Sequence, residues 1–573
     1  MYLRTIQRHN KDGTTVRYVQ LAHNHRKGAS TTAKVLVQLG REDRLDVDAL
    51  RRLVASISRY LDGHAAPPAT AGPDGALQVE SARTLGAIWL LDGLWRKLGV
   101  ADALRRVLGA RRFTTDVERV LFALVCNRAI DPMSKLSAAE WACCDAAIPG
   151  LAAMDDDQAY RAMDLLVTAD AEARVQEAVF FAAAHLLNLE VDLLLFDTTS
   201  TYFERDGDDG NDGFRRFGHS KDHRGDLPQV VIGLAVTREG IPVRCWCWPG
   251  NTTDMTVLRQ VKDDLRGWRL GRVVTVVDRG FAADDNLRYL TRAGGHWIAG
   301  ERLRDGTADV AQVLARQGRY QQVRDNLRVK EVRLGEGDAA RRFVLCHNPA
   351  QAEHDRAQRE QQLAAAAAEL ERIAALRAKQ ASKAAHAKQQ AGRGRRQRAA
   401  TAEDHLKAEC ALRDHPVLGR WLRQTPGGRL VIDRGKVRAE ERLDGKFLLS
   451  TSDPDLSAED VALGYKNLLE AERAFRDLKT TLELRPIWHR LEHRIRAHVL
   501  LCWLALLLVR VTERQTAQTW RRVSTELGRL QLVTLAGAAG RVQHTTALTP
   551  TQRELYAATG IAPPPRVTSL QAR

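Results

Sequence analysis

The 573-residue sequence lacks the features that mark membrane, secreted and zinc-binding proteins. Its longest apolar run, Val499–Val509, is too short to cross a bilayer, so we expect a core helix and no membrane partner. The N-terminus, MYLRTIQRHNKDG, has no apolar stretch typical of a secretory signal. The eight cysteines show neither C-x2-C spacing nor the density of a disulfide framework. We therefore expect free thiols in a reducing cytosol.

Composition excludes a wholly disordered or collagenous chain and points to an anionic partner. Apolar residues make up 44% and charged residues 28%, as in ordinary globular proteins. The length indicates about three or four domains. Lys and Arg number 87 against 71 Asp and Glu, which gives a net charge of +16. A surplus of this size favours a polyanion, with nucleic acid ahead of a membrane surface, although a general preference for arginine would also produce it.

The first third of the chain divides into three segments by composition. Residues 1–64 are rich in β-hairpin patterns, with strands expected at Thr15–Leu21 and Ala33–Leu39. Residues 65–80 form a linker that is rich in Ala, Pro and Gly. Residues 81–189 have helical periodicity. This region is either a DNA-binding or dimerisation domain or a helical bundle without such a role.

The spacing of apolar residues changes at residue 190, where a mixed α/β core is expected to begin. Apolar strands and helical segments follow in the order β-β-β-α-β-α-β up to residue 300. Residues 301–457 interrupt this pattern with a β-rich insertion, which includes a long helix at about Gln351–Gln390. Residues 458–530 are helical again and supply the second part of the core. The tail, 531–573, contains one short helix and a Pro-rich end.

The long helix leads into a basic stretch. Residues Arg377–Arg398 include eight basic side chains and no acidic one, and they end in GRGRRQR. Arg393, Arg395 and Arg396 are therefore candidate DNA contacts, and a solvated arm is the alternative.

Three segments carry candidate catalytic carboxylates. Asp197 and Asp278 each follow a buried apolar strand, which places them at the carboxyl edge of a sheet, where α/β folds bind ligands. Tyr465, Glu472 and Lys479 are spaced by seven residues, so on one helix they share a stripe that drifts by only about 20° per interval.

Arg476 lies one turn beyond Glu472 on the same predicted stripe, whereas Glu470 faces elsewhere. A solvated face with a Glu-to-Arg pair is the alternative for this stripe. The two strand-end aspartates favour the catalytic interpretation. Three carboxylates are what two-metal phosphoryl transfer requires, because Mg²⁺ prefers anionic oxygen ligands. Lys and Arg would then hold phosphate groups.

The arrangement resembles the DDE triad of RNase H-like transposases. The sequence is most similar to bacterial insertion-sequence transposases with the YREK signature, Y-x2-R-x3-E-x6-K, of the insertion-sequence-four type. Tyr465, Glu472 and Lys479 match this spacing, and Leu468 stands where the signature has Arg. The segments Asn127–Trp141, Gly218–Val236, Gly240–Asp254 and Glu483–Leu508 also resemble stretches of these transposases.

The resemblance implies an RNase H-like core and a cut-and-paste reaction. Asp197, Asp278 and Glu472 would be the catalytic, metal-binding residues, with two Mg²⁺ ions that Mn²⁺ can replace. Tyr465, Arg476 and Lys479 would contact DNA. The partners implied are double-stranded DNA, as transposon inverted repeats and target, and a second copy of the chain in a homodimeric synaptic complex. The location implied is the bacterial cytoplasm, at the nucleoid.

Other hypotheses remain open at this stage. An RNase H-like nuclease or resolvase would cut without strand transfer, and a derived DNA-binding protein would have lost catalysis. His219 and His223 are either a metal pair or part of a polar loop, and His489 and His493 are either phosphate contacts or a solvated face. Trp421, in the insertion, is a candidate for base stacking.

Overall fold

The computed structural model describes most of the chain, in two compact units, Met1–Leu77 and Gln78–Arg573. The described residues are 2–9, 15–27, 30–42, 45, 77–109, 116–168, 171–268, 270–304, 307–336, 340–390, 403–537 and 540–572. Arg393, Arg395 and Arg396, with most of the predicted linker 65–80, lie outside them.

The first unit contains a three-stranded antiparallel sheet of β1 (Tyr2–His9), β2 (Thr15–Lys27) and β3 (Ser30–Arg41). The two predicted strands lie within β2 and β3, but both strands are longer than predicted. Pairing continues to Lys27↔Ser30, so much of the predicted turn HNHRKGAS is strand. Hydrogen bonding between the strands outweighs the turn propensity of these polar residues.

The predicted helical region begins the second unit. Its helices are α2 (Gly86–Lys97), α3 (Val100–Leu108), α4 (Val117–Ile130), α5 (Lys135–Cys144), α6 (Asp156–Thr168) and α7 (Ala171–Leu187). The Asp116 side chain caps α4 by accepting hydrogen bonds from the amides of Glu118 and Arg119.

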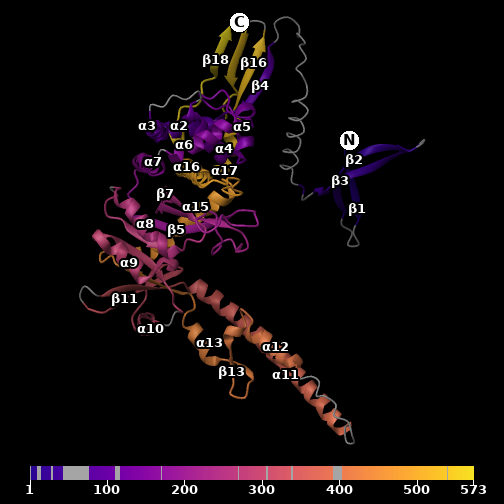
Figure 1. Cartoon of the computed structure of the whole chain (residues 1–573), viewed down its shortest axis with the longest axis vertical. Helices are drawn as coiled ribbons and strands as arrows, with labels where there is room; N and C mark the ends of the chain where they lie inside the picture. The colour runs from indigo at the N-terminus through magenta and orange to yellow at the C-terminus, as the bar shows by residue number, and fades with distance from the viewer. Residues whose placement is uncertain are drawn as a thin grey trace. The chain divides into compact units, whose positions relative to one another are not determined.

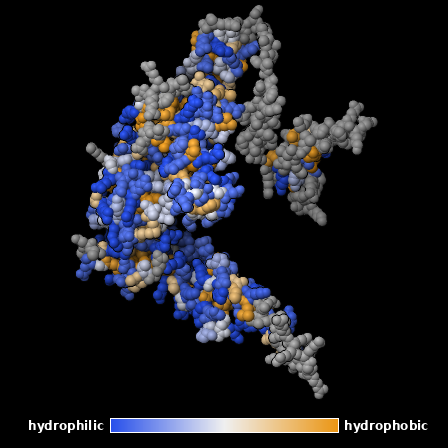
Figure 2. All heavy atoms as spheres, in the orientation of Figure 1, coloured by the Kyte–Doolittle hydropathy of each residue, from blue (hydrophilic) through white to orange (hydrophobic). Residues whose placement is uncertain are grey.

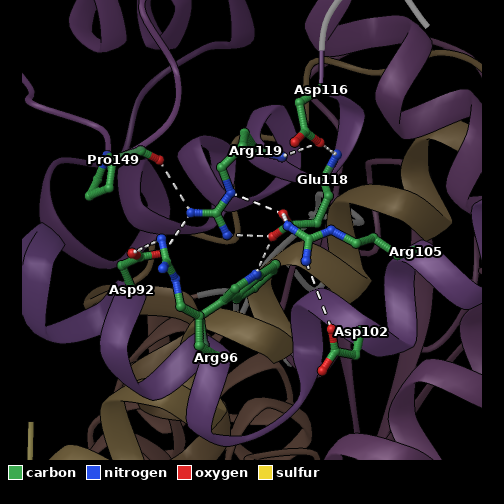
Figure 3. Close-up of polar contacts among 9 residues, drawn as sticks. Asp92, Arg96, Asp102, Arg105, Asp116, Glu118, Arg119 and Pro149 are labelled. Carbon is green, nitrogen blue, oxygen red and sulfur yellow. Dashed lines mark hydrogen bonds and ion pairs between the residues drawn. The ribbon is translucent and has the colours of Figure 1, made fainter. Parts of the chain in front are cut away.

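A buried ion-pair network joins α2, α3 and α4 (Figure 3). Arg119 Nη1 donates to Asp92 Oδ1 at 2.6 Å, and Trp95 Nε1 donates to Glu118 Oε1 at 2.6 Å. Arg105 donates to the second oxygen of Glu118 at 2.8 Å. Removing one partner of the buried Arg119–Asp92 pair costs about 3–5 kcal/mol, so this pair fixes how α2 packs on α4, whereas the Arg105 side chain of α3 is 57% exposed.

A nine-stranded sheet forms the centre of the second unit. The strands of this sheet that come first in the sequence lie in the spatial order β7-β6-β5-β8-β9, with β5 parallel to β8 and β8 parallel to β9. The strands are β5 (Leu193–Tyr202), β6 (Gln229–Thr237), β7 (Pro242–Pro249), β8 (Val274–Val277) and β9 (His296–Glu301). With α8 (Asp254–Arg266) and α9 (Asp284–Thr291), the chain order is the predicted β-β-β-α-β-α-β.

The two faces of this sheet pack against different helices. Leu194 and Phe196 of β5 pack in a cluster with residues of α8 and α9. Leu193 and Leu195 point to the opposite face, into a cluster with residues of the C-terminal helices. Because side chains alternate along a strand, Asp197 lies on the same face as Leu193 and Leu195.

The predicted insertion extends the central sheet. Its strands β10 (Gln321–Arg324), β11 (Leu327–Leu334), β12 (Arg341–His347) and β15 (Lys446–Thr451) continue the sheet beyond β9. β15 pairs antiparallel with β9 and gives that strand a partner on its outer edge. The predicted insertion therefore shares a sheet with the core.

Between β12 and β15 the chain makes a long excursion. The predicted long helix is α11 (Pro349–Gln390), which lies beside α12 (Glu403–Arg413) in Figure 1. The smaller elements of the insertion are α10 (Ala308–Ala315), β13 (Leu422–Gln424), β14 (Leu430–Ile432) and α13 (Arg434–Glu441).

The C-terminal region is helical as predicted up to residue 527, but the tail differs from its prediction. The helices are α14 (Ala458–Lys466), α15 (Leu469–Thr480), α16 (Glu492–Thr516) and α17 (Trp520–Leu527). The tail contains the predicted short helix, α18 (Pro550–Thr559), and three strands that the sequence analysis missed: β16 (Gln531–Gly537), β17 (Gly540–Thr545) and β18 (Val567–Ala572). They form a four-stranded sheet with β4 (Gln78–Thr84), which begins inside the predicted linker.

α16 is the one helix in the described part of the chain that is long and apolar enough to cross a membrane. Of its apolar window, 94% is buried inside the protein, as in a core helix. Figure 2 shows hydrophilic side chains over much of the visible surface of the second unit.

Candidate active site

Asp197 and Asp278 lie on adjacent parallel strands. Phe196 pairs with Val277, so the aspartate that follows each of them is brought to the same level of the sheet. Asp278 follows the last residue of β8, as predicted, and precedes a short 3-10 turn, Arg279–Phe281. Asp197 does not end its strand, because β5 continues to Tyr202 through its pairing with β6.

The environment of Asp197 disfavours its charged form. Burial, together with the carboxylates of Asp278 and Asp254, raises the pKa of Asp197 to about 6, against the opposing effects of the Lys221 ammonium and the Thr198 amide. A carboxyl group of this kind is stabilised as an anion when a cation lies against it.

Tyr465 reaches Asp278 from α14. Its hydroxyl donates a hydrogen bond of 2.7 Å to Asp278 Oδ1, and burial together with this carboxylate raises the pKa of Tyr465. The prediction that Tyr465, Glu472 and Lys479 share a single helix is wrong. α14 ends at Lys466 and α15 begins at Leu469, after a tight turn in which the amide of Leu468 donates to the carbonyl of Tyr465.

Because of this turn, the residues of the predicted stripe lie in different environments. Glu472, in the first turn of α15, and Arg476 are exposed. α15 packs on β5 and β6, but Glu472 does not join the two aspartates: among the described residues, no group of three or more His, Cys, Asp or Glu could hold a metal ion. Glu470 lines a separate cleft of about 390 Å³ with Arg238, Glu239 and Arg510.

Lys479 is held by a carboxylate that sequence reasoning missed. Lys479 Nζ lies 2.9 Å from Asp222 Oδ1, and Arg485 Nη1 donates to Asp222 Oδ2 at 2.8 Å. Burial lowers the pKa of Lys479, and Asp222 opposes this shift. The signal was present in GHSKDHRG, which joins an acidic side chain to basic ones in the loop after β5.

Two further charged residues, Lys221 and Asp254, belong to the same region. Lys221 Nζ lies 3.5 Å from Asp197 Oδ1 and 3.5 Å from Asp254 Oδ2. Asp254 is the first residue of α8 and was missed because its partners Thr198 and Lys221 are far away in the sequence. Only the fold brings β5, the following loop and α8 together.

A cleft of about 520 Å³ continues this region past the end of β5. It is lined by Tyr202 of β5 and by the segment Arg485–Arg490. Trp488 is 71% exposed, and the Arg485 guanidinium lies 5.3 Å from the centre of the Tyr202 ring. Exposed aromatic and guanidinium groups together suit both the bases and the phosphates of DNA.

Two of the alternative candidates, Trp421 and His489, are excluded by burial. Trp421 is 1% exposed and donates to Gln362 Oε1, so it has no free face for a base. Burial lowers the pKa of His489 to about 3, which removes it as a cationic phosphate contact. His493 is only half-buried and lies 3.1 Å from Asp164, and His219 is exposed.

Comparison with known families decides the identity. The family described as "Transposase DDE domain" matches residues 192–508, more than half of the chain. The family described as "IS1634 family transposase, N-terminal domain" matches residues 3–68. The chain belongs to the insertion-sequence DDE transposases. The resemblance predicted from the signature is therefore confirmed, and the transposase is a DNA-acting polynucleotidyl transferase of a family that normally uses divalent metal ions.

One solved structure similar to the transposase is a piggyBac transposase synaptic complex with hairpin DNA. The identity is 9% and the TM-score 0.35, over 77% of this chain and 79% of that one. No curated protein matches the transposase sequence.

Proposed function

We propose that this transposase cleaves DNA at terminal inverted repeats and joins the ends to target DNA by two-metal phosphoryl transfer, with Asp197, Asp278 and Glu472 as the catalytic carboxylates. The observation that carries the proposal is the placement of Asp197 and Asp278 side by side on β5 and β8. The raised pKa of Asp197 supports a site that accepts a cation. Glu472 is assigned through the signature spacing.

The residues present fit a divalent cation. The Lys221 ammonium already lies against Asp197, and the surrounding acceptors are oxygens, which Mg²⁺ prefers. Asp197 and Asp278 would hold the cation, and Glu472, which the structure does not place beside them, is assigned as the third ligand of two ions from the signature spacing alone. Two Mg²⁺ ions, or Mn²⁺ in their place, would activate the attacking oxygen and stabilise the leaving oxygen.

The other candidate side chains would orient a carboxylate or bind DNA. Tyr465 holds the Asp278 carboxylate through its hydroxyl, so its role is proposed to be orientation. Asp222 keeps Lys479 and Arg485 next to each other, where they would meet the phosphate backbone. Arg476, exposed on α15, would contact DNA, and so would Arg393, Arg395 and Arg396 of the basic stretch.

We also propose that the core is RNase H-like. The strand order β7-β6-β5-β8-β9, the parallel trio β5, β8 and β9, and a helix carrying Glu472 after the insertion support this assignment. Synapsis of two transposon ends supports a homodimer as the active form. The proposed location is the bacterial cytoplasm, at the nucleoid.

The test is cleavage of a labelled transposon end in the presence of Mg²⁺. Asp197→Asn, Asp278→Asn and Glu472→Gln are each expected to abolish cleavage and to retain end binding. Glu470→Gln is the matched control, because Glu470 lies on the same helix as Glu472 but lines a different cleft. Retained cleavage in any of the three variants would contradict the assignment of that residue.

A second assay supplies a pre-cleaved end and a target plasmid. Joined product is expected with the wild type, and this step separates a transposase from a nuclease that only cuts. End cleavage without any joining would overturn strand transfer.

A further inference from the structure

The Lys221 ammonium contacts oxygen atoms of three residues, Thr198, Asp197 and Asp254. Nζ is 2.7 Å from both the carbonyl oxygen and the hydroxyl oxygen of Thr198. It is 3.5 Å from one carboxylate oxygen each of Asp197 and Asp254. Backbone carbonyl, hydroxyl and carboxylate oxygens are the ligand types that hard divalent cations take in proteins.

Thr198 couples the lysine to Asp254. Its hydroxyl oxygen accepts from Lys221 and donates its own proton to Asp254 Oδ1. Its backbone amide donates to Asp197 Oδ1 at 2.7 Å. Thr198 is buried, so this arrangement is fixed on β5, whereas Lys221 belongs to a loop and its side chain is one-third exposed. The anions are therefore anchored and the cation is the part that can move.

The single positive charge of Lys221 cannot neutralise the carboxylates of both Asp197 and Asp254. Its single charge faces Asp197 and Asp254, and Asp278 adds to the negative potential at Asp197. A divalent cation would compensate the same carboxylates better, and it would compete directly with Lys221 because both would use the Asp197 carboxylate.

We infer that Lys221 is a resident counter-cation that a divalent metal ion displaces, and that Asp254 is a further carboxylate supporting the cation site. The inference rests on the proposed metal site at Asp197. Lys221 keeps Asp197 and Asp254 together in the metal-free transposase. Once displaced, its ammonium is free to pair with a DNA phosphate, so metal loading and DNA engagement are coupled through one side chain.

The experiment measures Mn²⁺ binding to the full-length transposase without DNA, by electron paramagnetic resonance. Lys221→Met is expected to bind the tightest Mn²⁺ about 10-fold more tightly than the wild type, which is about 1.4 kcal/mol, because the competing cation is gone. Lys221→Gln, which keeps a hydrogen-bonding group near Thr198, should show the same gain. Asp254→Asn should bind Mn²⁺ about 10-fold more weakly.

Thermal unfolding gives a second readout. In EDTA, Lys221→Met should melt below the wild type, because Asp197 and Asp254 then repel each other without a counter-cation. Adding Mn²⁺ should raise its melting temperature by more than that of the wild type. Two matched controls are expected to behave as wild type: Lys97→Met, whose ammonium bonds the carbonyl of Thr559, and Asp226→Asn in the same loop as Lys221.

The outcomes separate this inference from the proposed function. Unchanged Mn²⁺ binding in Asp197→Asn would contradict the metal site itself. If Asp197→Asn loses Mn²⁺ but Lys221→Met and Lys221→Gln bind it no more tightly than the wild type, displacement is wrong and the metal site stands. Unchanged affinity in Asp254→Asn would remove Asp254 from the site.

Discussion

The hydroxyl of Tyr465 donates a 2.7 Å hydrogen bond to Asp278 Oδ1, and this contact joins the first residue of the signature to the second of the proposed catalytic aspartates. The two residues are 187 positions apart in the sequence. The tyrosine of the signature therefore acts on a carboxylate, and we expect its loss to affect catalysis more than DNA binding.

Tyr465→Phe keeps the ring and removes the hydrogen bond. We expect cleavage to fall roughly 10–100-fold, the range found when a partner that orients a metal ligand is lost. End binding, measured by mobility shift, should stay within about twofold of the wild type. A variant that cleaves normally but binds DNA poorly would show that Tyr465 is a DNA contact, as first predicted from the sequence.

Asp222→Asn removes the charge that holds Lys479 and Arg485. The two cations are then left next to each other, and we expect a loss of about 1.5–3 kcal/mol in unfolding free energy, together with slower cleavage. Chemical denaturation measures the first effect. Asp226→Asn is the matched control, because its pair with Arg224 is exposed and should contribute almost nothing. Equal stability of the two variants would contradict a positioning role for Asp222.

The raised pKa of Asp197 gives the metal-free protein a defined pH dependence. The folded value is about 6 and the ordinary value 3.8, so the folded protein binds an extra proton between these limits. The stabilisation is present below about pH 4 and is lost as the pH rises through 6. At pH 8 the buried charge therefore costs about 2–3 kcal/mol.

Asp197→Asn has no such charge, so in EDTA it should be more stable than the wild type at pH 8 and similar to it at pH 4. Melting temperatures across this range measure the difference. A constant difference between the two proteins at every pH would contradict the raised pKa.

The cleft beyond β5 should contribute to end binding. Trp488→Ala is expected to weaken binding by about 1–3 kcal/mol if a base stacks on the ring. Arg490→Ala should lower the slope of log affinity against log salt by about one, because one phosphate contact is lost. Leu570→Ala, 79% exposed on the C-terminal sheet, is a matched control for losing a large exposed side chain. Wild-type affinity in both cleft variants would place the DNA elsewhere.

Local patterns predicted most of the core from the sequence. Alternation and apolar runs gave the strands around Asp197 and Asp278, and composition gave the long helix α11 within two residues at its start. These features depend on side chains close together in the chain, so periodicity is enough to find them.

What the sequence could not predict depends on partners far along the chain. The three tail strands are short, and their sheet is completed by β4, which lies more than 400 residues earlier in the sequence and pairs with β16. The break between α14 and α15 was missed because Asn467 and Leu468 remain in a right-handed helical conformation, and no Gly or Pro marks the turn. Lys221, Asp222 and Asp254 became candidates only when the fold brought them together.

The ends of the excursion that carries α11 lie side by side. His347 pairs with Lys446, and the amide of Asn348 donates to the carbonyl of Gly445 at 2.8 Å. Residues 349–444 therefore leave and re-enter the sheet at one hairpin position, where a short turn would join β12 to β15 equally well. Shortening this excursion is therefore expected to leave the strands that carry the aspartates in place.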